Sequence, residues 1–346
     1  MINGVANRLS LNKRAVNVGN SSPELRFAVK KRVVITDHAF IDTAFEESVA
    51  LEHGADFAIF DCKTPGETKQ AVKDADVVFV NFAPITKIVL ESMKPGSTVI
   101  RYGIGYDNVD VSSASALLIN VANVPDYGVE TVADHAAASL LSLCRRLPEY
   151  NKLIQENGWA RPGDVGRLRG FRSMTVGLVG VGRTALALHK RLKPFGFAFV
   201  AYDPLALSET FKSAGIESVT LFELASRSHA ISLHAPSNSQ TRQMINSEFL
   251  KRVQPGTVLV NTARGSLINE AAVADALREG RLAGVALDVT DPEPLSSNSE
   301  LRSLNGVILT PHAAFYDEDS LVRLQKLASE EAGRALRNEP LRCPVI

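Results

Sequence analysis

The stretch MTVGLVGVGRTA, residues 174–185, decides how the chain is built. Its first half is an apolar run with β-branched residues, which predicts a buried strand. The pattern GxGxxA overlaps the end of this run and opens a segment expected to be helical. In such a unit Gly180 permits the tight turn, and Gly182 lets a pyrophosphate approach the backbone at the helix N-terminus. The stretch therefore predicts a dinucleotide-binding site, with a tight turn that binds no ligand as the alternative.

An acidic residue supports this interpretation and distinguishes between two dinucleotides. Asp203 follows the next expected strand, residues 197–202. A carboxylate at that position accepts hydrogen bonds from ribose hydroxyls and repels a 2′-phosphate, which favours NAD over NADP. Ala185 stands where a third glycine often packs the helix on the strand, and alanine is small enough for that contact.

Strand and helix signals alternate on both sides of this motif. Continuous apolar strands separated by helices imply parallel sheets covered on both faces, so the expected fold class is α/β. A long helix at 129–146 is expected to lead from a first unit of this kind into the second. In the first unit, strands are expected at 33–36, 55–60, 77–80, 97–102 and 118–121, and helices at 46–53 and 68–74.

The last expected helix, residues 319–336, makes the first unit discontinuous, because its apolar stripe needs a sheet to cover. The stripe consists of Leu321, Leu324, Ala328, Ala332 and Ala335. We expect an N-terminal extension (1–31), a substrate domain (32–127 and 318–346) and an NAD-binding Rossmann domain (128–317). Residues 1–23 contain basic but no acidic side chains, and we expect a disordered or loosely docked segment there, with a transit segment as the alternative.

The composition excludes several classes of protein. Lys+Arg and Asp+Glu both number 38, so no nucleic-acid partner is expected. No apolar run reaches about 18 residues, so no membrane-spanning helix is expected. Cys62, Cys144 and Cys343 form no Cys-x-x-Cys pair, so neither a metal site nor a disulfide framework is expected. Free thiols favour a cytoplasmic location.

Four loops that follow expected strands in the second unit carry side chains suited to chemistry. Ligands of open α/β sheets bind outside the carboxyl ends of the strands, so these loops are expected to converge on one crevice. They contain HAP (234–236), NTARG (261–265), Asp288 with DPEP (291–294), and TPH (310–312).

These loops hold the groups that hydride transfer to a carbonyl requires. Histidine donates a proton near neutral pH, a neighbouring carboxylate favours its protonated form, and arginine binds a carboxylate with a fork of donors. His312, Glu293 and Arg264 fit these three roles. Each residue alone is more often structural, but their joint presence behind a dinucleotide motif favours catalysis.

Several motifs resemble the D-isomer-specific 2-hydroxyacid dehydrogenase family over roughly residues 32–335. The most specific are NTARG (261–265), ALDV (286–289) with EP (293–294), and TPH (310–312). Within the family the chain is most similar to the C-terminal-binding-protein-like branch, through RYGIGYDN (101–108), AYDP (201–204) and PHAAFY (311–316).

The resemblance implies two Rossmann- or flavodoxin-like domains, NAD as cofactor, a small 2-oxo or 2-hydroxy acid as substrate, and a homodimer through the cofactor domain. It implies that Arg264, Glu293 and His312 are catalytic and that Arg101, Gly103, Ile104, Gly105 and Phe315 bind substrate. The residues implied to bind the cofactor are Gly180, Gly182, Arg183, Thr184, Asp203, His234, Pro236, Thr262, Ala263 and Asp288.

Two departures from the family pattern stand out. Thr184 and Ala185 replace an aliphatic–glycine pair, which leaves cofactor affinity open. Phe315 stands where the nearest branch has tryptophan, so the side chain of the preferred acid is open as well.

We expect an NAD-dependent D-2-hydroxyacid dehydrogenase, and two alternatives stay open. One is an NAD(H)-sensing scaffold or corepressor that binds peptide motifs, as in the nearest branch. The other is an oxidoreductase that acts on formate or phosphite, which Ile104 disfavours because the loop offers backbone amides rather than a lysine there.

Overall fold

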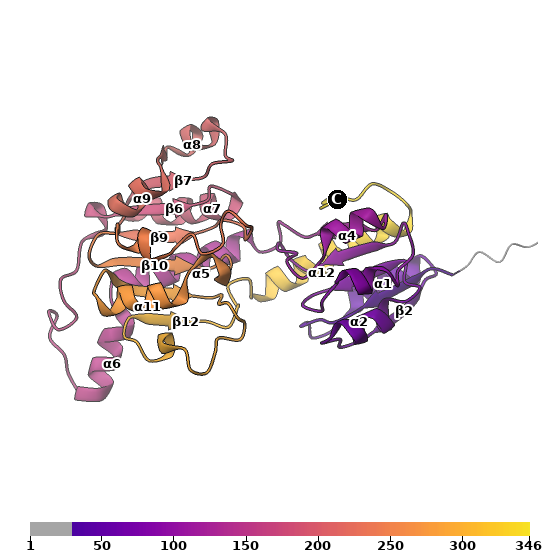
Figure 1. Ribbon diagram of the computed structural model, residues 1–346, viewed down its shortest axis with the longest axis horizontal. Coiled ribbons are helices and arrows are strands. Elements are labelled where there is room, and N and C mark those ends of the chain that lie inside the picture. Colours follow the sequence, from indigo (N-terminus) through magenta and orange to yellow (C-terminus); the bar gives the residue numbers. More distant parts are fainter. Residues whose placement is uncertain (1–29) are drawn as a thin grey trace, which may run out of the picture. The chain divides into compact units, whose positions relative to one another are not determined.

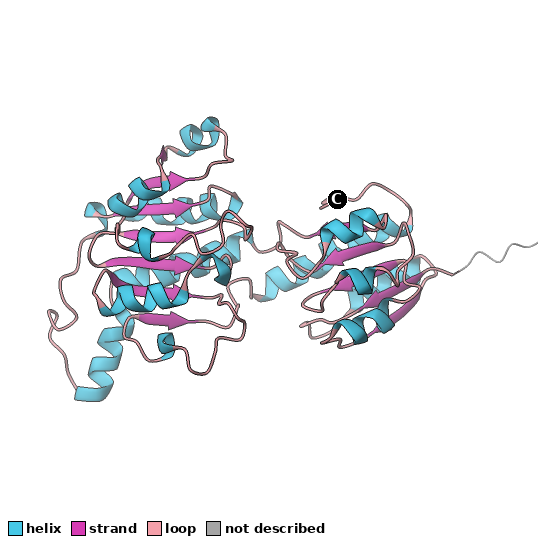
Figure 2. Ribbon diagram, in the orientation of Figure 1, coloured by secondary structure: helices cyan, strands magenta, loops and turns pink. Residues whose placement is uncertain are grey.

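The computed structural model describes residues 30–346 (Figure 1). The chain divides into two units, residues 1–30 and Lys31–Ile346, and the second carries all the features below. The segment predicted at 1–23 lies outside the described residues. The described chain is α/β with two parallel sheets, each covered by helices on both faces (Figure 2), so the predicted fold class is confirmed.

The first sheet has five parallel strands in the order β2-β1-β3-β4-β5. Its inner strands β1, β3 and β4 are largely buried from both sides, as parallel sheets require, and the edge strand β2 is partly exposed. Helices α1 and α12 cover one face, and α2, α3 and α4 cover the other. The strands are β1 (Arg32–Ile35), β2 (Asp56–Ile59), β3 (Val77–Val80), β4 (Thr98–Arg101) and β5 (Asn120–Asn123); the helices are α1 (Ala44–Glu52), α2 (Pro65–Val72), α3 (Lys87–Leu90), α4 (Val111–Ala116) and α12 (Glu318–Leu336).

The second sheet has seven parallel strands in the order β12-β11-β10-β9-β6-β7-β8. Helices α5, α7 and α8 pack on one face, and α9, α10 and α11 on the other. The strands are β6 (Thr175–Val179), β7 (Ala198–Tyr202), β8 (Glu217–Ser218), β9 (Ala230–Leu233), β10 (Thr257–Asn261), β11 (Leu282–Leu287) and β12 (Val307–Leu309); the helices are α5 (Val129–Cys144), α6 (Leu147–Asn157), α7 (Arg183–Leu192), α8 (Ser208–Ala214), α9 (Leu221–Arg227), α10 (Ser247–Leu250) and α11 (Glu270–Arg278).

Helix α12 joins the end of the chain to the first sheet. Its N-terminus is held by Asp317, whose side chain accepts from the Ser320 amide. Leu324, Ala328 and Ala332 of the predicted stripe are buried against β1, β3 and β4, while its outer members Leu321 and Ala335 are half-buried. The domain boundaries at 127/128 and 317/318 stay predictions.

Two elements differ from their predicted bounds for local reasons. The strand predicted at 118–121 begins only at Asn120, because Leu118 has a φ of 57° in the turn after α4. The helix predicted at 68–74 begins at Pro65, because Thr64 and Glu67 form a capping box and proline suits the first helical position. None of the helices within residues 30–346 is long and apolar enough to cross a membrane.

Candidate active site

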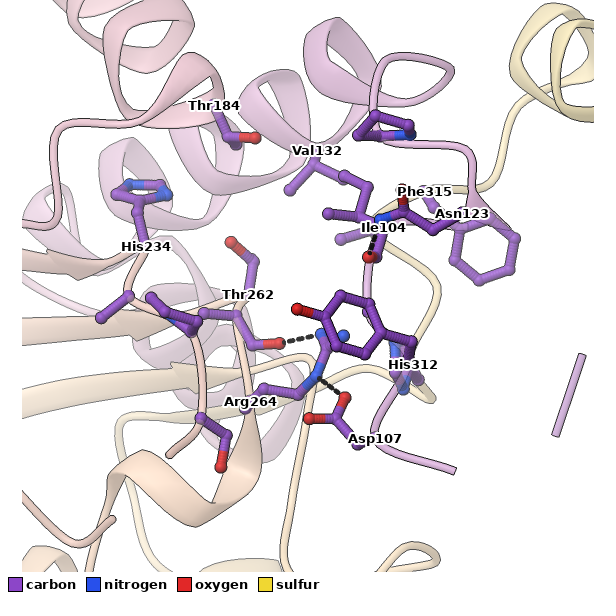
Figure 3. A pocket seen from close by; sticks show the side chains of 18 of the residues that line it. Ile104, Asp107, Asn123, Val132, Thr184, His234, Thr262, Arg264, His312 and Phe315 are labelled. Atoms are coloured by element: carbon purple, nitrogen blue, oxygen red, sulfur yellow. Dashed lines mark hydrogen bonds and ion pairs between the residues drawn. The ribbon is translucent and has the colours of Figure 1, made fainter. Parts of the chain in front are cut away.

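A cavity of about 430 Å³ lies where loops at the carboxyl ends of strands from both sheets meet (Figure 3). All four loops predicted to converge contribute to it or to its immediate support. The predicted residues that line it are Arg101, Ile104, Gly105, Arg183, Thr184, His234, Pro236, Thr262, Ala263, Arg264, Asp288, His312 and Phe315. The predicted residues that do not line it are Gly103, Gly180, Gly182, Asp203 and Glu293.

Glu293 supports His312 from behind the cavity lining. Its Oε2 lies 2.9 Å from Nδ1 of the imidazole, and its Oε1 accepts from the Thr290 amide. Burial opposes ionisation of Glu293, but the hydrogen bond and charge of His312 outweigh burial and hold the pKa of this carboxyl below its usual range. An ionised carboxylate beside Nδ1 accepts a hydrogen bond from that nitrogen and so fixes the tautomer and orientation of the ring.

The loop that carries His312 is fastened by the buried carboxylate of Asp288. One oxygen accepts from the Thr310 hydroxyl at 2.6 Å and the Ala313 amide at 2.8 Å, and the other accepts from the Ala314 amide at 2.9 Å. This network holds His312 at a φ of 53°, a left-handed conformation that non-glycine residues rarely adopt. Asp288 therefore orients the imidazole as well as lining the cavity.

Arg264 is held at its backbone and at its guanidinium group. The Asn261 side chain donates to the Arg264 carbonyl at 2.8 Å and accepts from the Ala263 amide at 3.0 Å, which fixes the loop after β10. The guanidinium donates from Nε to Asp107 at 2.7 Å and from Nη1 to the Ala263 carbonyl at 2.6 Å (Figure 3).

Two glycines make room for two arginines in the turn after β4. Gly103 has a φ of 127°, and a Cβ there would lie 2.1 Å from Nη1 of Arg101. A Cβ at Gly105 would lie 1.3 Å from Nη2 of Arg264. The two guanidinium groups therefore pack against the backbone on either side of Ile104.

The side chain of Arg101 carries a buried donor that residues 30–346 leave unpaired. Its Nε is buried and has no hydrogen-bond partner among the described residues. Burial lowers the pKa of Arg101 to about 10, and the positive charge of Arg264 acts in the same direction. Burial also raises the pKa of the neighbouring Tyr127 to about 12, so its hydroxyl stays protonated at neutral pH.

The turn between β6 and α7 is shaped to accept a dinucleotide. Gly180 has a φ of 95°, and a Cβ there would lie 2.9 Å from the backbone of His234, so only glycine fits. A Cβ at Gly182 would meet no atom within 4 Å, so open space lies before the α7 N-terminus, which has no side-chain cap. Asp203 accepts from the Val181 amide at 2.9 Å, which brings a carboxylate beside this turn.

Two further side chains are suited to contact a bound dinucleotide. The Thr262 hydroxyl is buried without a partner among the described residues, although its residue lines the cavity. Burial lowers the pKa of His234 to about 4, so this ring is neutral at pH 7 and serves as a hydrogen-bonding group. The residues present therefore fit NAD: an open helix N-terminus for the pyrophosphate, a carboxylate for the ribose, and unpaired donors near the cavity.

Sequence reasoning missed several residues of the cavity. Asp107 lies in the quoted RYGIGYDN motif, but no ion pair is readable from one sequence. Asn123, which donates to the Ile104 carbonyl at 2.7 Å, was missed because the strand was predicted to end earlier. The other unpredicted lining residues are Tyr106, Pro125, Tyr127, Val132, Ala235, Ser237 and Ala314.

Three aromatic residues of this region, Phe315, Phe82 and Tyr102, differ in their position relative to the cavity. Phe315 lines the cavity, with its ring centroid 6.3 Å from that of His312. Phe82 does not line it but also lies 6.3 Å from the imidazole, as an edge contact. Tyr102 belongs to the core, where its ring stacks on Phe79 at 5.4 Å.

Comparison with known proteins places this cavity in an enzyme family. Residues 137–314 match the sequence model described as "D-isomer specific 2-hydroxyacid dehydrogenase, NAD binding domain". The chain is 35% identical to a glyoxylate reductase of Korarchaeum cryptofilum over 264 residues, 75% of this chain and 80% of that protein. It is 32% identical to a D-3-phosphoglycerate dehydrogenase of Methanocaldococcus jannaschii over 303 residues, 86% of this chain but only 57% of that longer protein.

A solved structure shares the whole architecture. The TT0316 protein from Thermus thermophilus superimposes with a TM-score of 0.79 at 28% identity, over 91% of this chain and 100% of that one. The chain belongs to the D-isomer specific 2-hydroxyacid dehydrogenase family. It is an NAD-dependent oxidoreductase that acts on the CH–OH group of D-2-hydroxy acids.

Proposed function

We propose that the protein reduces a small 2-oxo acid to the D-2-hydroxy acid, and catalyses the reverse oxidation, with His312 and Glu293 as the proton-transfer pair. The observation that carries this proposal is the 2.9 Å contact between these two side chains beside the cavity that Arg264 also lines. NADH, when bound, supplies the hydride.

His312 handles the proton in this proposal. With Nδ1 bonded to Glu293, Nε2 is the atom that donates a proton to the C2 oxygen during reduction and accepts it back during oxidation. Positioned acid catalysis of this kind typically contributes about 10²- to 10⁴-fold to the rate.

Arg264 and the turn at 103–105 bind the substrate carboxylate. Arg264 also polarises the C2 carbonyl, because its positive charge stabilises the negative charge that develops on that oxygen. Ile104 and Gly105 line the cavity, which supports a role for their backbone amides, and the Nε of Arg101, another lining residue, which is unpaired within the described chain, supports a further contact with the acid.

The substrate is proposed to be a short 2-oxo acid. The cavity of about 430 Å³ has to hold both the nicotinamide and the acid, and Phe315 gives it an apolar wall. One relative is named a glyoxylate reductase, so glyoxylate is the first compound to test, followed by hydroxypyruvate, pyruvate and longer 2-oxo acids.

The test is loss of NADH absorbance with this panel, using the wild-type enzyme and His312→Ala. We expect turnover with at least one acid and a fall of about 10²-fold or more in the variant, with NADH binding retained. Wild-type turnover in His312→Ala would overturn the assignment of the proton donor. No turnover with any acid, although NADH binds, would favour the peptide-binding scaffold instead.

We propose in addition that two copies associate through the cofactor domain. Helix α6 extends away from the second sheet and has no buried residue (Figure 1), while Leu147, Ile154 and Trp159 in and beside it are exposed. Exposed apolar groups of this kind favour a protein interface. Light scattering should give the mass of a dimer, and Ile154→Asp should shift the mass towards the monomer. A monomeric wild-type protein would contradict this part of the proposal.

A cytoplasmic location is the last part of the proposal. All three cysteines are free, as is typical of proteins in reducing compartments. Cell fractionation with an antibody would test the location, and recovery from an oxidising compartment would contradict it.

A further inference from the structure

The carboxylate of Asp107 is the side-chain partner of the Arg264 guanidinium. Its Oδ2 accepts from Nε of Arg264 at 2.7 Å (Figure 3). Asp107 follows β4 of the first sheet and Arg264 follows β10 of the second. The ion pair therefore joins two loops that are distant in sequence and that both line the cavity.

Contacts within the protein occupy two of the three nitrogens of the Arg264 guanidinium group. Nε binds Asp107 and Nη1 binds the Ala263 carbonyl. Nη2 has no hydrogen-bond partner among residues 30–346 and lies against Gly105 of the substrate turn. The arrangement leaves the Nη2 side of the fork for a ligand carboxylate.

The rest of Arg264 cannot set this orientation by itself. Asn261 fixes only the backbone of the loop, and an arginine side chain has several rotatable bonds beyond it. The Ala263 carbonyl is a single neutral acceptor on the adjacent residue. Hydrogen bonds at two nitrogens fix the orientation of a planar guanidinium group. The charged Asp107 carboxylate at Nε supplies the second of these hydrogen bonds.

Among the described residues, the Asp107 side chain makes no second hydrogen bond that would stabilise the fold. Its side chain is 56% exposed, and Oδ1 has no partner among the described residues. The loop is anchored instead by the next residue, Asn108, whose side chain donates to the carbonyls of Asn81 and Ala83. Removal of the Asp107 carboxylate should therefore leave the loop folded.

We propose that Asp107 is a positioning residue for the reaction: it holds Arg264 so that Nη2 faces the carboxylate of the 2-oxo acid. The inference rests on the proposed role of Arg264 in binding that acid. Because Asp107 acts through Arg264, its effect should disappear once the guanidinium fork is gone.

The test is a double-mutant cycle with Asp107→Ala, Asp107→Asn, Arg264→Lys and their combinations. Asp107→Ala should lower kcat/KM for the 2-oxo acid by about 10-fold or more, since an arginine that is not held spends less time in the productive orientation. Asp107→Asn should fall between Ala and wild type, because its amide oxygen still accepts one hydrogen bond. In the Arg264→Lys background, either Asp107 change should alter kcat/KM by less than about two-fold.

Two controls separate positioning from a structural effect. The KM for NADH and the melting temperature should stay within experimental error in both Asp107 variants. Asp61→Asn removes an exposed carboxylate of the same domain that pairs with Lys63, and it should leave kcat/KM unchanged.

A second readout does not require turnover. The Kd of oxamate, a 2-oxo acid analogue that is not reduced, should rise about five-fold or more in Asp107→Ala and show the same dependence on Arg264. If the wild-type enzyme reduced no 2-oxo acid but this coupling appeared, the proposed function would fail and the positioning role would stand. Additive effects in both readouts, or a rise in kcat/KM and oxamate affinity when Asp107 is removed, would overturn the inference.

Discussion

Asp203 accepts a hydrogen bond from the Val181 amide at 2.9 Å, so the carboxylate at the end of β7 is tied to the glycine turn that precedes α7. Its other oxygen accepts from the Leu205 and Ala206 amides at 3.0 and 3.2 Å. The group that is expected to select the cofactor is therefore also part of the turn that is expected to bind it.

Asp203→Asn should separate the selection of the cofactor from the structure of the glycine turn. The amide oxygen can keep some of the backbone contacts, but the negative charge that repels a 2′-phosphate is lost. We expect the preference for NADH over NADPH, measured as the ratio of kcat/KM values, to fall about 10-fold. An unchanged ratio would show that another group selects the cofactor.

The two glycines of the turn should respond differently to substitution. A side chain at Gly182 enters open space, so Gly182→Val should keep the melting temperature within about 2 °C but weaken NADH binding about 30-fold. Gly180→Ala should instead destabilise the fold by about 1 kcal/mol or more, because it combines positive φ with a contact on the His234 backbone. Thermal melts and NADH fluorescence titrations of the two variants test this difference. Equal losses of stability and of NADH affinity in the two variants would contradict it.

The carboxylate of Glu293 should set the pH range of reduction. Its pKa is lowered in the folded protein, so a negative charge faces Nδ1 of His312 at neutral pH. Protonation of Glu293 in acid removes that charge, so the wild-type reduction rate should fall at a pH below the usual range of a glutamate, and this acidic fall should be absent in Glu293→Gln. Rate–pH profiles of the two proteins test this expectation, and coincident acidic limbs would contradict it.

The lowered pKa of Glu293 also makes the stability of the fold depend on pH. Because the folded pKa of Glu293 is depressed, its ionised form stabilises the fold above the unfolded pKa, and this contribution is lost as the pH falls through the folded value. Urea unfolding should therefore show a smaller loss of stability on acidification in Glu293→Gln than in wild type.

A buried carboxylate fastens the last residues of the chain. Glu331 is fully buried and accepts from the Arg342 and Cys343 amides at 2.8 and 2.7 Å. Glu331→Ala leaves both amides without this acceptor, and we expect a loss of about 1–3 kcal/mol in the free energy of unfolding. Glu330→Ala changes an exposed neighbour and should change that free energy by less than about 0.5 kcal/mol, so equal losses would refute this account.

The alternating pattern of the sequence predicted the fold class, because each buried parallel strand is an apolar run that is visible on its own. Element ends were less predictable, since the start of β5 depends on the left-handed turn at Leu118. The start of α2 depends on the capping box of Thr64 and Glu67, a local signal that the sequence itself carries.

The candidate site was predictable to the extent that its residues follow strand ends. The role of Asp107 was not, because its partner Arg264 is distant in sequence and only the packing of the two loops brings them together. The same reason hid Asn123 and Tyr127, because the contact of Asn123 with the Ile104 carbonyl and the position of Tyr127 beside Gly103 depend on the packing around the turn after β4.

The close packing of Arg101 on Gly103 and of Arg264 on Gly105 also limits how this site can change during evolution. A larger residue at either glycine position needs the space that a guanidinium now fills, and a smaller residue at either arginine position leaves that space empty. At position 103 the φ of 127° favours glycine whatever residue stands at 101, so only Gly105 and Arg264 could be replaced as a pair. Such a paired substitution would reshape the cavity and would remove the guanidinium group that is proposed to bind the acid.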